Sequence, residues 1–531
     1  MAMQERPEVR EIIGGKYWEQ SFEKFFLKVY VPDNDLDGQI NNYGFRAPLL
    51  LVFEEEKQGM DSAVSFARES GLAKIAADND SSVLFVYPTV EGGWAGAGED
   101  FYAAVIAEIK MIQVYRDGIV ENYDFFAREF KGYFVRGAIF RADIYSFGKS
   151  ADFAAKHLLK TLQGEYLWGP GEITPAMVSM QGLNAVPDVQ RKDIAMISVG
   201  NSPEINKAFE GCEHLLTKER AEYVQDYYGF VKQFKMWCGR IEYEPDFPAL
   251  NMTEEAGCAT VNTSPDNISP FRDDKTHKVG YFAYYNNGLF DNGPVPLVLG
   301  FHGGGDSSMY LTFVAGWWEV AHDHNFLFVS VENHQHVTAT EAVEIVEHLK
   351  KKYSIDEKRI YATGFSMGAG KTWDCATQYP EVFAGIMPAS ALFPVYHSFF
   401  GGPVTTRINK EVPVPVFYSG GELSHVPELP RQADSALERI VYVSEVNQLK
   451  KPFSAVDFNH QEGWENPLWG LNGEKKEEIP DPSRGSVLTV QYYDSEDGVC
   501  RTALASVSGQ VHECRKHSIE NAWKFISRFT R

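Results

Sequence analysis

The sequence has few cysteines, which excludes a fold held together by a dense disulfide framework. Its 531 residues contain six cysteines, and none of them forms a CxxC pair. Cysteines scattered over a chain of this length do not define a set of bridges or a zinc motif. Cys500 and Cys514 flank a predicted strand pair and are close enough in sequence to be bridged, but free buried thiols are the simpler interpretation.

Long apolar runs and an excess of basic residues are also missing. No stretch of 18 or more apolar residues occurs, so we expect no transmembrane helix. The 50 Lys and Arg are outnumbered by 73 Asp and Glu, and the net charge of −23 argues against binding to nucleic acid or to anionic membranes. The segment Met1–Pro7 lacks the apolar core of a signal peptide. We therefore expect a cytoplasmic protein, or one secreted after removal of its signal peptide.

The most informative motif is Gly364-Phe365-Ser366-Met367-Gly368. It follows a run of strand-forming residues over 359–363 and precedes a run of small residues over 369–372. A serine between two glycines at such a strand-to-helix turn is the arrangement that exposes a nucleophile, because the glycines remove side chains that would clash with the neighbouring strand and helix. Ser366 is therefore the candidate nucleophile.

A glycine-rich turn, His302-Gly303-Gly304-Gly305, follows the predicted strand 294–301. Turns of this kind bring backbone N–H groups close to a developing oxyanion. The candidate oxyanion donors are the N–H of Met367, directly after the serine, and that of Gly303 or Gly304.

A nucleophilic serine needs a base and an acid that orients the base, and in this strand–helix context they follow in the order serine, acid, histidine. His512 follows the last predicted strand, 502–507, by a short turn, and is preferred over His517 as the base. The acid should follow the strand that ends at 418–419. Glu422 is the first choice, Glu428 the second and Asp494 the third.

The second half of the sequence alternates strands with helices. Strands are predicted near 294–301, 326–331, 359–363, 383–388, 414–419, 488–493 and 502–507. Thr338 and Glu341 form a capping box ahead of a helix with an apolar face. This alternation predicts an α/β fold with a mostly parallel, doubly wound sheet. We expect a catalytic domain over 276–531, a linker over 243–275, and an aromatic loop insertion at about 452–486.

The first half, 1–242, repeats this plan and is predicted to be a second, non-catalytic domain of the same type. Ile144-Tyr145 through Ser150 aligns without a gap on Ile360-Tyr361 through Ser366. Where the second half has the glycine-rich turn, the first half has Glu54-Glu55-Glu56-Lys57, whose carboxylates would repel an oxyanion. An inactive tandem domain is compatible with a binding or scaffold role, or with a homodimer.

With these residues in place, the second half resembles the polyhydroxybutyrate depolymerase and feruloyl esterase group of α/β-hydrolases. The resemblance rests on 296–305, 359–370 and 492–512. It implies a serine esterase that cleaves aryl or hydroxyalkanoate-type carboxylic esters without a cofactor. Together with the repeat in the first half, it predicts two tandem α/β-hydrolase-like domains. His302, Trp464 and Trp469 are the candidates for substrate contact. The group usually has Gly-Gly or Gly-His before its catalytic histidine, whereas this chain has Gln510-Val511.

Three alternatives remain open from the sequence. A serine peptidase or amidase would use the same residues, and only its substrate would distinguish it. A binding protein is a second alternative, which the intact motifs of the second half oppose. Glu332, His334 and His336 form a histidine-rich cluster, but their spacing fits no standard zinc pattern, and a surface loop is preferred.

Overall fold

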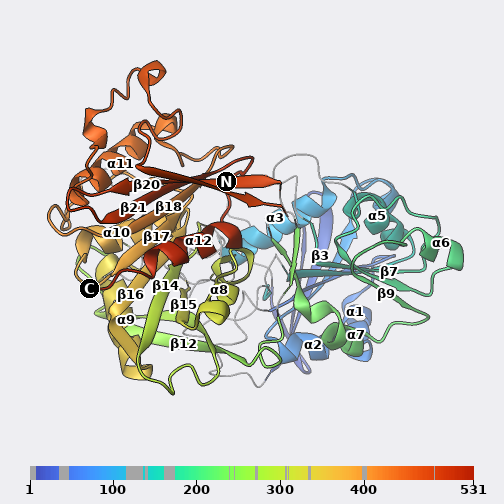
Figure 1. Cartoon of the computed structure of the whole chain (residues 1–531). Helices are drawn as coiled ribbons and strands as arrows, with labels where there is room; N and C mark the ends of the chain where they lie inside the picture. Colours follow the sequence, from blue (N-terminus) through green and yellow to red (C-terminus); the bar gives the residue numbers. More distant parts are fainter. Residues whose placement is uncertain are drawn as a thin grey trace. The chain divides into compact units, whose positions relative to one another are not determined.

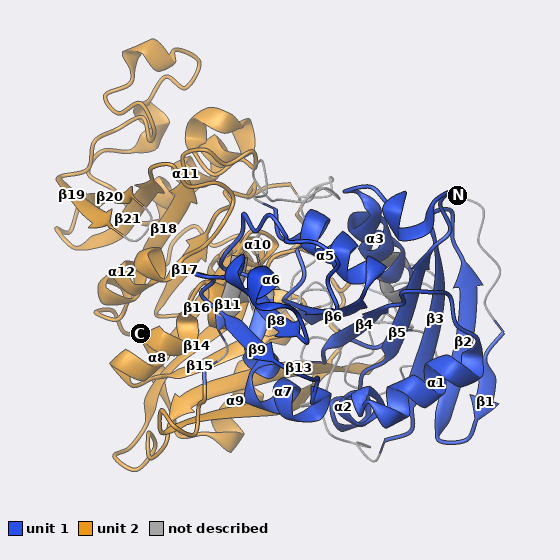
Figure 2. Ribbon diagram, turned by 90° about the vertical axis from the view of Figure 1, so that its right-hand side faces the viewer, with its two compact units in different colours: residues 1–245 blue, residues 246–531 orange. Residues whose placement is uncertain are grey.

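The computed structural model describes residues 8–34, 47–114, 135–137, 141–160, 174–237, 240–243, 245–268, 273–304, 308, 310–332, 337–397, 404–482 and 485–531. The chain divides into two compact units, Met1–Pro245 and Asp246–Arg531 (Figure 2). None of the helices within the described ranges combines the length and the apolar character needed to cross a membrane.

Unit 1 is built on one mixed sheet, of nine strands in its described part. The strands are β1 (Arg10–Ile12), β2 (Gly15–Ser21), β3 (Phe25–Pro32), β4 (Leu49–Phe53), β5 (Val83–Pro88), β6 (Ala142–Phe147), β7 (Met177–Gln181), β8 (Ala195–Val199) and β9 (Leu215–Lys218). The helices are α1 (Met60–Glu69), α2 (Leu72–Asp78), α3 (Phe101–Val114), α5 (Lys149–Leu158), α6 (Pro203–Lys207) and α7 (Tyr223–Gly229). A separate hairpin pairs β10 (Phe234–Trp237) with β11 (Arg240–Tyr243).

The sheet of unit 1 is buried on both faces. Along β4, Leu49, Leu51 and Phe53 belong to one apolar cluster, and Leu50 and Val52 to another on the opposite face. Successive side chains of a strand point to opposite faces, so a continuous apolar run is what a strand covered by helices on both sides requires.

Unit 2 is built on a larger mixed sheet, of ten strands in its described part. The strands are β12 (Met252–Asn262), β13 (Thr276–Asn286), β14 (Val295–Phe301), β15 (Leu327–Val331), β16 (Ile355–Phe365), β17 (Gly385–Ala389), β18 (Val416–Gly421), β19 (Lys475–Asp481), β20 (Ser486–Asp494) and β21 (Cys500–Val507). The helices are α8 (Trp317–His324), α9 (Ala339–Lys352), α10 (Met367–Gln378), α11 (Asp434–Val446) and α12 (Lys516–Ile526) (Figure 1).

Helices cover both faces of the unit 2 sheet. Leu297 and Leu299 of β14 face a cluster that includes apolar residues of α9, α10 and α11, whereas α8 and α12 contact each other and lie on the other face. The capping box predicted at Thr338 and Glu341 is present, with α9 beginning at the next residue, Ala339.

The two sheets share one strand order. Unit 1 runs β2-β3-β5-β4-β6-β7-β8-β9, and unit 2 runs β12-β13-β15-β14-β16-β17-β18-β21. In both, the first two pairings of the series are antiparallel and all the later pairings are parallel. The predicted fold of two tandem α/β-hydrolase-like domains is confirmed.

Two details of the predicted organisation change. The stretch 243–275, expected to be a linker, contains β12, which pairs along its whole length with β13, because its Thr, Val and Cys residues outweigh the turn residues around them. The predicted insertion at 452–486 is shorter, since its last part forms β19, which pairs with β20. Cys500 and Cys514 are free thiols.

Candidate active site

Ser366 lies on a sharp turn between β16 and α10. Its backbone has φ 53° and ψ −117°, a conformation that residues with a side chain rarely adopt. A Cβ on Gly364 would lie 2.2 Å from the carbonyl oxygen of Gly368, and a Cβ on Gly368 would lie 2.0 Å from that of Phe301. The turn therefore needs glycine at both positions, as the sequence motif predicts.

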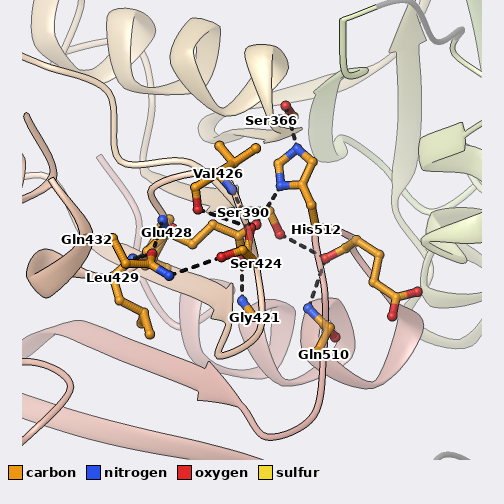
Figure 3. Close-up of polar contacts among 12 residues, drawn as sticks. Ser366, Ser390, Gly421, Ser424, Val426, Glu428, Leu429, Gln432, Gln510 and His512 are labelled. Carbon is orange, nitrogen blue, oxygen red and sulfur yellow. Dashed lines mark hydrogen bonds and ion pairs between the residues drawn. The ribbon is translucent and has the colours of Figure 1, made fainter. Parts of the chain in front are cut away.

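Ser366 is joined to His512 and Glu428 by a chain of hydrogen bonds (Figure 3). The Oγ of Ser366 lies 2.8 Å from His512 Nε2, and His512 Nδ1 lies 2.5 Å from Glu428 Oε1. Ser366 is 8% exposed, His512 1% and Glu428 0%. A buried carboxylate accepts, so Nδ1 carries the imidazole proton and Nε2 is left to accept the proton of the serine hydroxyl.

The structure corrects the choice of acid. Glu422, the first choice, accepts a hydrogen bond from Ser506 Oγ at 2.9 Å. The carboxylate beside His512 belongs to Glu428, the second choice. After β18 the chain makes a loop that returns to its own start, where Gly421 N donates to Glu428 Oε2 at 2.5 Å. This return places the acid six residues later than a short turn would.

Residues to which the sequence assigned no role in the site hold the acid and the base. Gln432 Oε1 accepts from the backbone N–H groups of Glu428 and Leu429, each at 2.7 Å. On the other side, Ser390 Oγ and Gln510 Nε2 both donate to the carbonyl of Glu513, the residue after His512. Ser390 has a positive φ of 59°. The contacts of Gln432 and Gln510 lie within four residues in sequence, whereas the bond from Ser390 to Glu513 joins segments far apart in the chain.

The predicted oxyanion donors lie at the start of α10 and directly after β14. Met367 is the first residue of α10, where no earlier turn of the helix supplies an acceptor for its N–H. Gly303 and Gly304 follow β14 and are buried, while Gly305 lies outside the described residues. Helix N-termini and such glycine turns favour developing negative charge.

His302 faces its own backbone rather than solvent. The side chain is buried, and its Nδ1 lies 2.7 Å from the carbonyl of Gly303. Burial lowers the pKa of His302 to about 4, against a smaller opposing effect of the bond to Gly303. The prediction that His302 contacts substrate is not supported by this position; the ring instead holds the turn that carries the glycines.

The two tryptophans predicted to contact substrate have other surroundings. Trp469 is 1% exposed and packs edge-to-face on Tyr418, so it belongs to the core of unit 2. Trp464 packs on Phe458 and donates to the carbonyl of Asp457, within its own loop. An aromatic residue in a polar segment can contact a substrate or pack inside the protein, and the sequence does not distinguish these two roles.

Unit 1 has the same turn but a different residue on it. Gly148 lies between β6 and α5 with φ 49° and ψ −117°, which matches Ser366. The gapless alignment of Ser150 on Ser366 is therefore wrong by two positions. Ser150 corresponds to Gly368, and its Oγ donates to the carbonyl of Phe53 at the end of β4.

The segment after β4 in unit 1 also departs from the glycine turn of unit 2. Glu54 is buried and accepts from Lys28 Nζ with both oxygens, each at 2.6 Å. A Cβ on Gly148 would lie 2.1 Å from the carboxylate of Glu55. Carboxylates thus stand where unit 2 has glycine backbone, as the sequence predicts.

Within the described part of the chain, no three His, Cys, Asp or Glu side chains are grouped so that they could hold a metal ion. Glu332 is buried and accepts from Ser308, and His334 and His336 lie outside the described residues.

Sequence comparison finds relatives for part of the chain. It is 30% identical over 135 residues to the bifunctional acetylxylan esterase/xylanase XynS20E of Neocallimastix patriciarum, which covers 24% of this chain and 19% of that protein. It is 47% identical over 45 residues to poly(3-hydroxyalkanoate) depolymerase C of Paucimonas lemoignei, covering 8% of this chain and 11% of that protein. The chain is related to α/β-hydrolases of the esterase type.

The α/β-hydrolase relatives are matched over less than a fifth of the first one's length, and no protein-family profile matches the chain. Among solved structures, the acetyl xylan esterase of Aspergillus awamori is 14% identical and covers 51% of this chain and 98% of that chain, with a TM-score of 0.32. The fold assignment therefore rests on the strand order of the two sheets.

Proposed function

We propose that the chain is a serine carboxylic-ester hydrolase that works through an acyl-enzyme. The observation that carries the proposal is the hydrogen-bonded series Ser366–His512–Glu428 at a strained strand-to-helix turn. These are the parts that activate a serine hydroxyl: a base in contact with the oxygen and an acid that fixes the tautomer of the base.

The proposed reaction has two halves. His512 Nε2 takes the proton of Ser366, whose Oγ attacks the ester carbonyl, and the N–H of Met367 with that of Gly303 or Gly304 holds the oxyanion. His512 then gives the proton to the departing alcohol. Water, activated by the same imidazole, releases the acid from Ser366 and restores the enzyme.

An ester is preferred as substrate because of the relatives. One is named for deacetylating xylan and the other for depolymerising a polyester, and both names describe ester cleavage. We propose aryl esters of the feruloyl type or hydroxyalkanoate-type esters as the substrate class.

The test is hydrolysis of short-chain and aryl chromogenic esters by the wild type and by Ser366→Ala. We expect turnover that falls by roughly three orders of magnitude or more in the variant. Ser65→Ala is the matched control, because Ser65 is an exposed serine on α1 whose hydroxyl donates to Glu69. Hydrolysis that survives in Ser366→Ala would reject the proposal, and cleavage of amides alone would reject the ester assignment.

We further propose that unit 1, taken as 1–245, does not hydrolyse esters and serves binding or assembly. Its turn carries Gly148, which has no nucleophilic atom, beside the carboxylate of Glu55. Because Ser366→Ala leaves unit 1 intact, loss of all hydrolysis in that variant of the full chain tests this proposal as well.

A further inference from the structure

The loop from the end of β18 to Glu428 carries an exposed histidine next to the base. His425 lies at the middle of this loop, and its ring centroid is 5.9 Å from that of His512 in an edge-to-face arrangement. The His512 ring also packs on the ring of Phe365, with 4.9 Å between the centroids. His512 itself is buried, whereas His425 is exposed.

The loop holds His425 in place. Ser424 Oγ contacts both the N–H and the carbonyl of Val426, at 3.1 Å each, so the residues on either side of His425 are tied to each other. Gln432 Nε2 donates to the carbonyl of Ser424, and Leu423 N donates to the carbonyl of Gln510. The backbone position of His425 is therefore fixed relative to His512.

The ring of His425 has polar atoms that the fold does not use. In the part of the chain that the structure describes, no hydrogen bond joins either of its ring nitrogens to another residue. An exposed imidazole nitrogen both donates and accepts, according to its tautomer. A braced polar group whose nitrogens make no bond within the described fold is available to a ligand.

The proposed reaction at Ser366 determines which part of a substrate lies near His425. The departing oxygen must lie within hydrogen-bond reach of His512 Nε2, about 2.6–3.2 Å. Atoms one to three bonds beyond that oxygen then lie several ångströms from the His512 ring, a distance comparable with the 5.9 Å between the centroids of the His425 and His512 rings. The acyl group lies on the other side of the ester bond.

We propose that His425 is a specificity-determining residue for the alcohol part of the ester and favours alcohols with a hydroxyl close to the ester oxygen. This inference rests on the proposed esterase function of Ser366. The hydroxyl bonds a nitrogen of His425 in the bound substrate and in the transition state. Exposed Leu423, two residues earlier, offers apolar contact to the carbon chain of the same alcohol.

The experiment compares two substrates of nearly equal size, 2-hydroxyethyl acetate and propyl acetate, which differ by a hydroxyl in place of a methyl group. The measured quantity is the ratio of their kcat/KM values. In the wild type we expect the hydroxylated ester to be preferred. One neutral hydrogen bond corresponds to about a three- to tenfold preference.

Three variants separate the hydrogen bond from the ring. His425→Phe keeps an aromatic ring beside His512 but has no nitrogen, and His425→Ala removes the ring; both should lower the ratio about three- to tenfold. His425→Gln restores a hydrogen-bond donor and an acceptor, so it should recover most of the wild-type ratio of kcat/KM values. A group that only tuned His512 would change both substrates equally and leave the ratio unchanged.

The outcomes distinguish this inference from the proposed function. If Ser366→Ala abolishes hydrolysis of both esters but the ratio is the same in the wild type, His425→Phe and His425→Ala, the role of His425 is refuted and the esterase stands. If Ser366→Ala retains hydrolysis, the esterase proposal fails. Thermal unfolding of each variant shows that the fold is intact, which is expected for an exposed side chain.

Discussion

Replacing Glu428 by glutamine is the most informative perturbation of the site. The carboxylate is fully buried and accepts two hydrogen bonds, one from His512 Nδ1 and one from Gly421 N, each at 2.5 Å. Both partners donate in the wild type. A glutamine of the same shape has only one oxygen to offer them, since its other terminal atom is a donor.

Each orientation of the new amide has a cost. If its oxygen stays on Gly421 N, its NH₂ faces His512 and selects the tautomer with the proton on Nε2, which cannot accept the proton of Ser366. If the amide turns over, NH₂ meets the N–H of Gly421 and a buried donor is left unsatisfied. In both cases the negative charge that stabilises the imidazolium is gone.

The two effects set the magnitude. An unsatisfied buried donor costs about 1–3 kcal/mol, and an opposite charge near a partly screened imidazolium is worth about 2–4 kcal/mol. Together these losses amount to about 3–7 kcal/mol, which corresponds to a fall in kcat of roughly 10²–10⁵. KM should change little, because the carboxylate does not face the substrate.

Steady-state hydrolysis of a chromogenic acetate ester measures this, with Glu422→Gln as the matched control. Glu422 accepts from Ser506 Oγ through one oxygen, which glutamine retains, so its kcat should stay within about threefold of the wild type. A near-normal kcat in Glu428→Gln, or a large loss in Glu422→Gln, would refute this account of the acid.

Three further predictions concern packing and stability. Gly368→Ala should destabilise unit 2 by about 1–3 kcal/mol and abolish hydrolysis, because its Cβ would lie 2.0 Å from a backbone oxygen. The control is Gly463→Ala, which has open space around it and should leave urea unfolding and activity unchanged. Equal effects of the two substitutions would contradict this prediction. His302 has a pKa of about 4 when folded, below its ordinary 6.5, so the unfolded state binds the proton first as pH falls. The stabilisation is complete above pH 6.5 and is lost toward pH 4. At pH 5 the loss is about 2 kcal/mol, and His302→Gln should remove that part of the pH dependence of urea unfolding. Lys28→Met or Glu54→Gln alone should lower the free energy of unfolding by about 3–5 kcal/mol, because each leaves the other member of a buried ion pair without its opposite charge. The double variant Lys28→Met with Glu54→Leu should recover most of this stability in thermal unfolding. Failure to recover it would indicate that the pair has a role beyond the ion pair itself.

The sequence predicted those parts of the site that depend on local geometry. Ser366 needs a turn with glycine at fixed positions, and His512 needs a short turn after a strand, so each leaves a pattern within a few residues. Glu428 leaves none. Its position depends on a loop that folds back on Gly421 and is braced by Gln432, and the length of that loop is not set by a short turn of the kind that places His512.

The same limit explains the errors in unit 1 and in the aromatic segment. Residues 144–150 match 360–366 in type, but the turn begins at Gly148, so residue type misplaced the alignment by two positions. Trp469 lies in a stretch of polar and turn residues, yet its ring is buried on Tyr418. The mostly parallel sheet, by contrast, follows from short apolar strands that alternate with helical segments, a pattern that is local in the sequence.

Gly148 has a consequence for stoichiometry. Two similar folded units in one chain suggest two equivalents of reactive serine, but only unit 2 has an oxygen at the tip of this turn. A rapid-mixing experiment with an ester whose acyl-enzyme is slow to hydrolyse should therefore release about one equivalent of alcohol per chain before the steady state. A reagent that forms a stable bond to the serine should add its mass once to the 59.8 kDa chain.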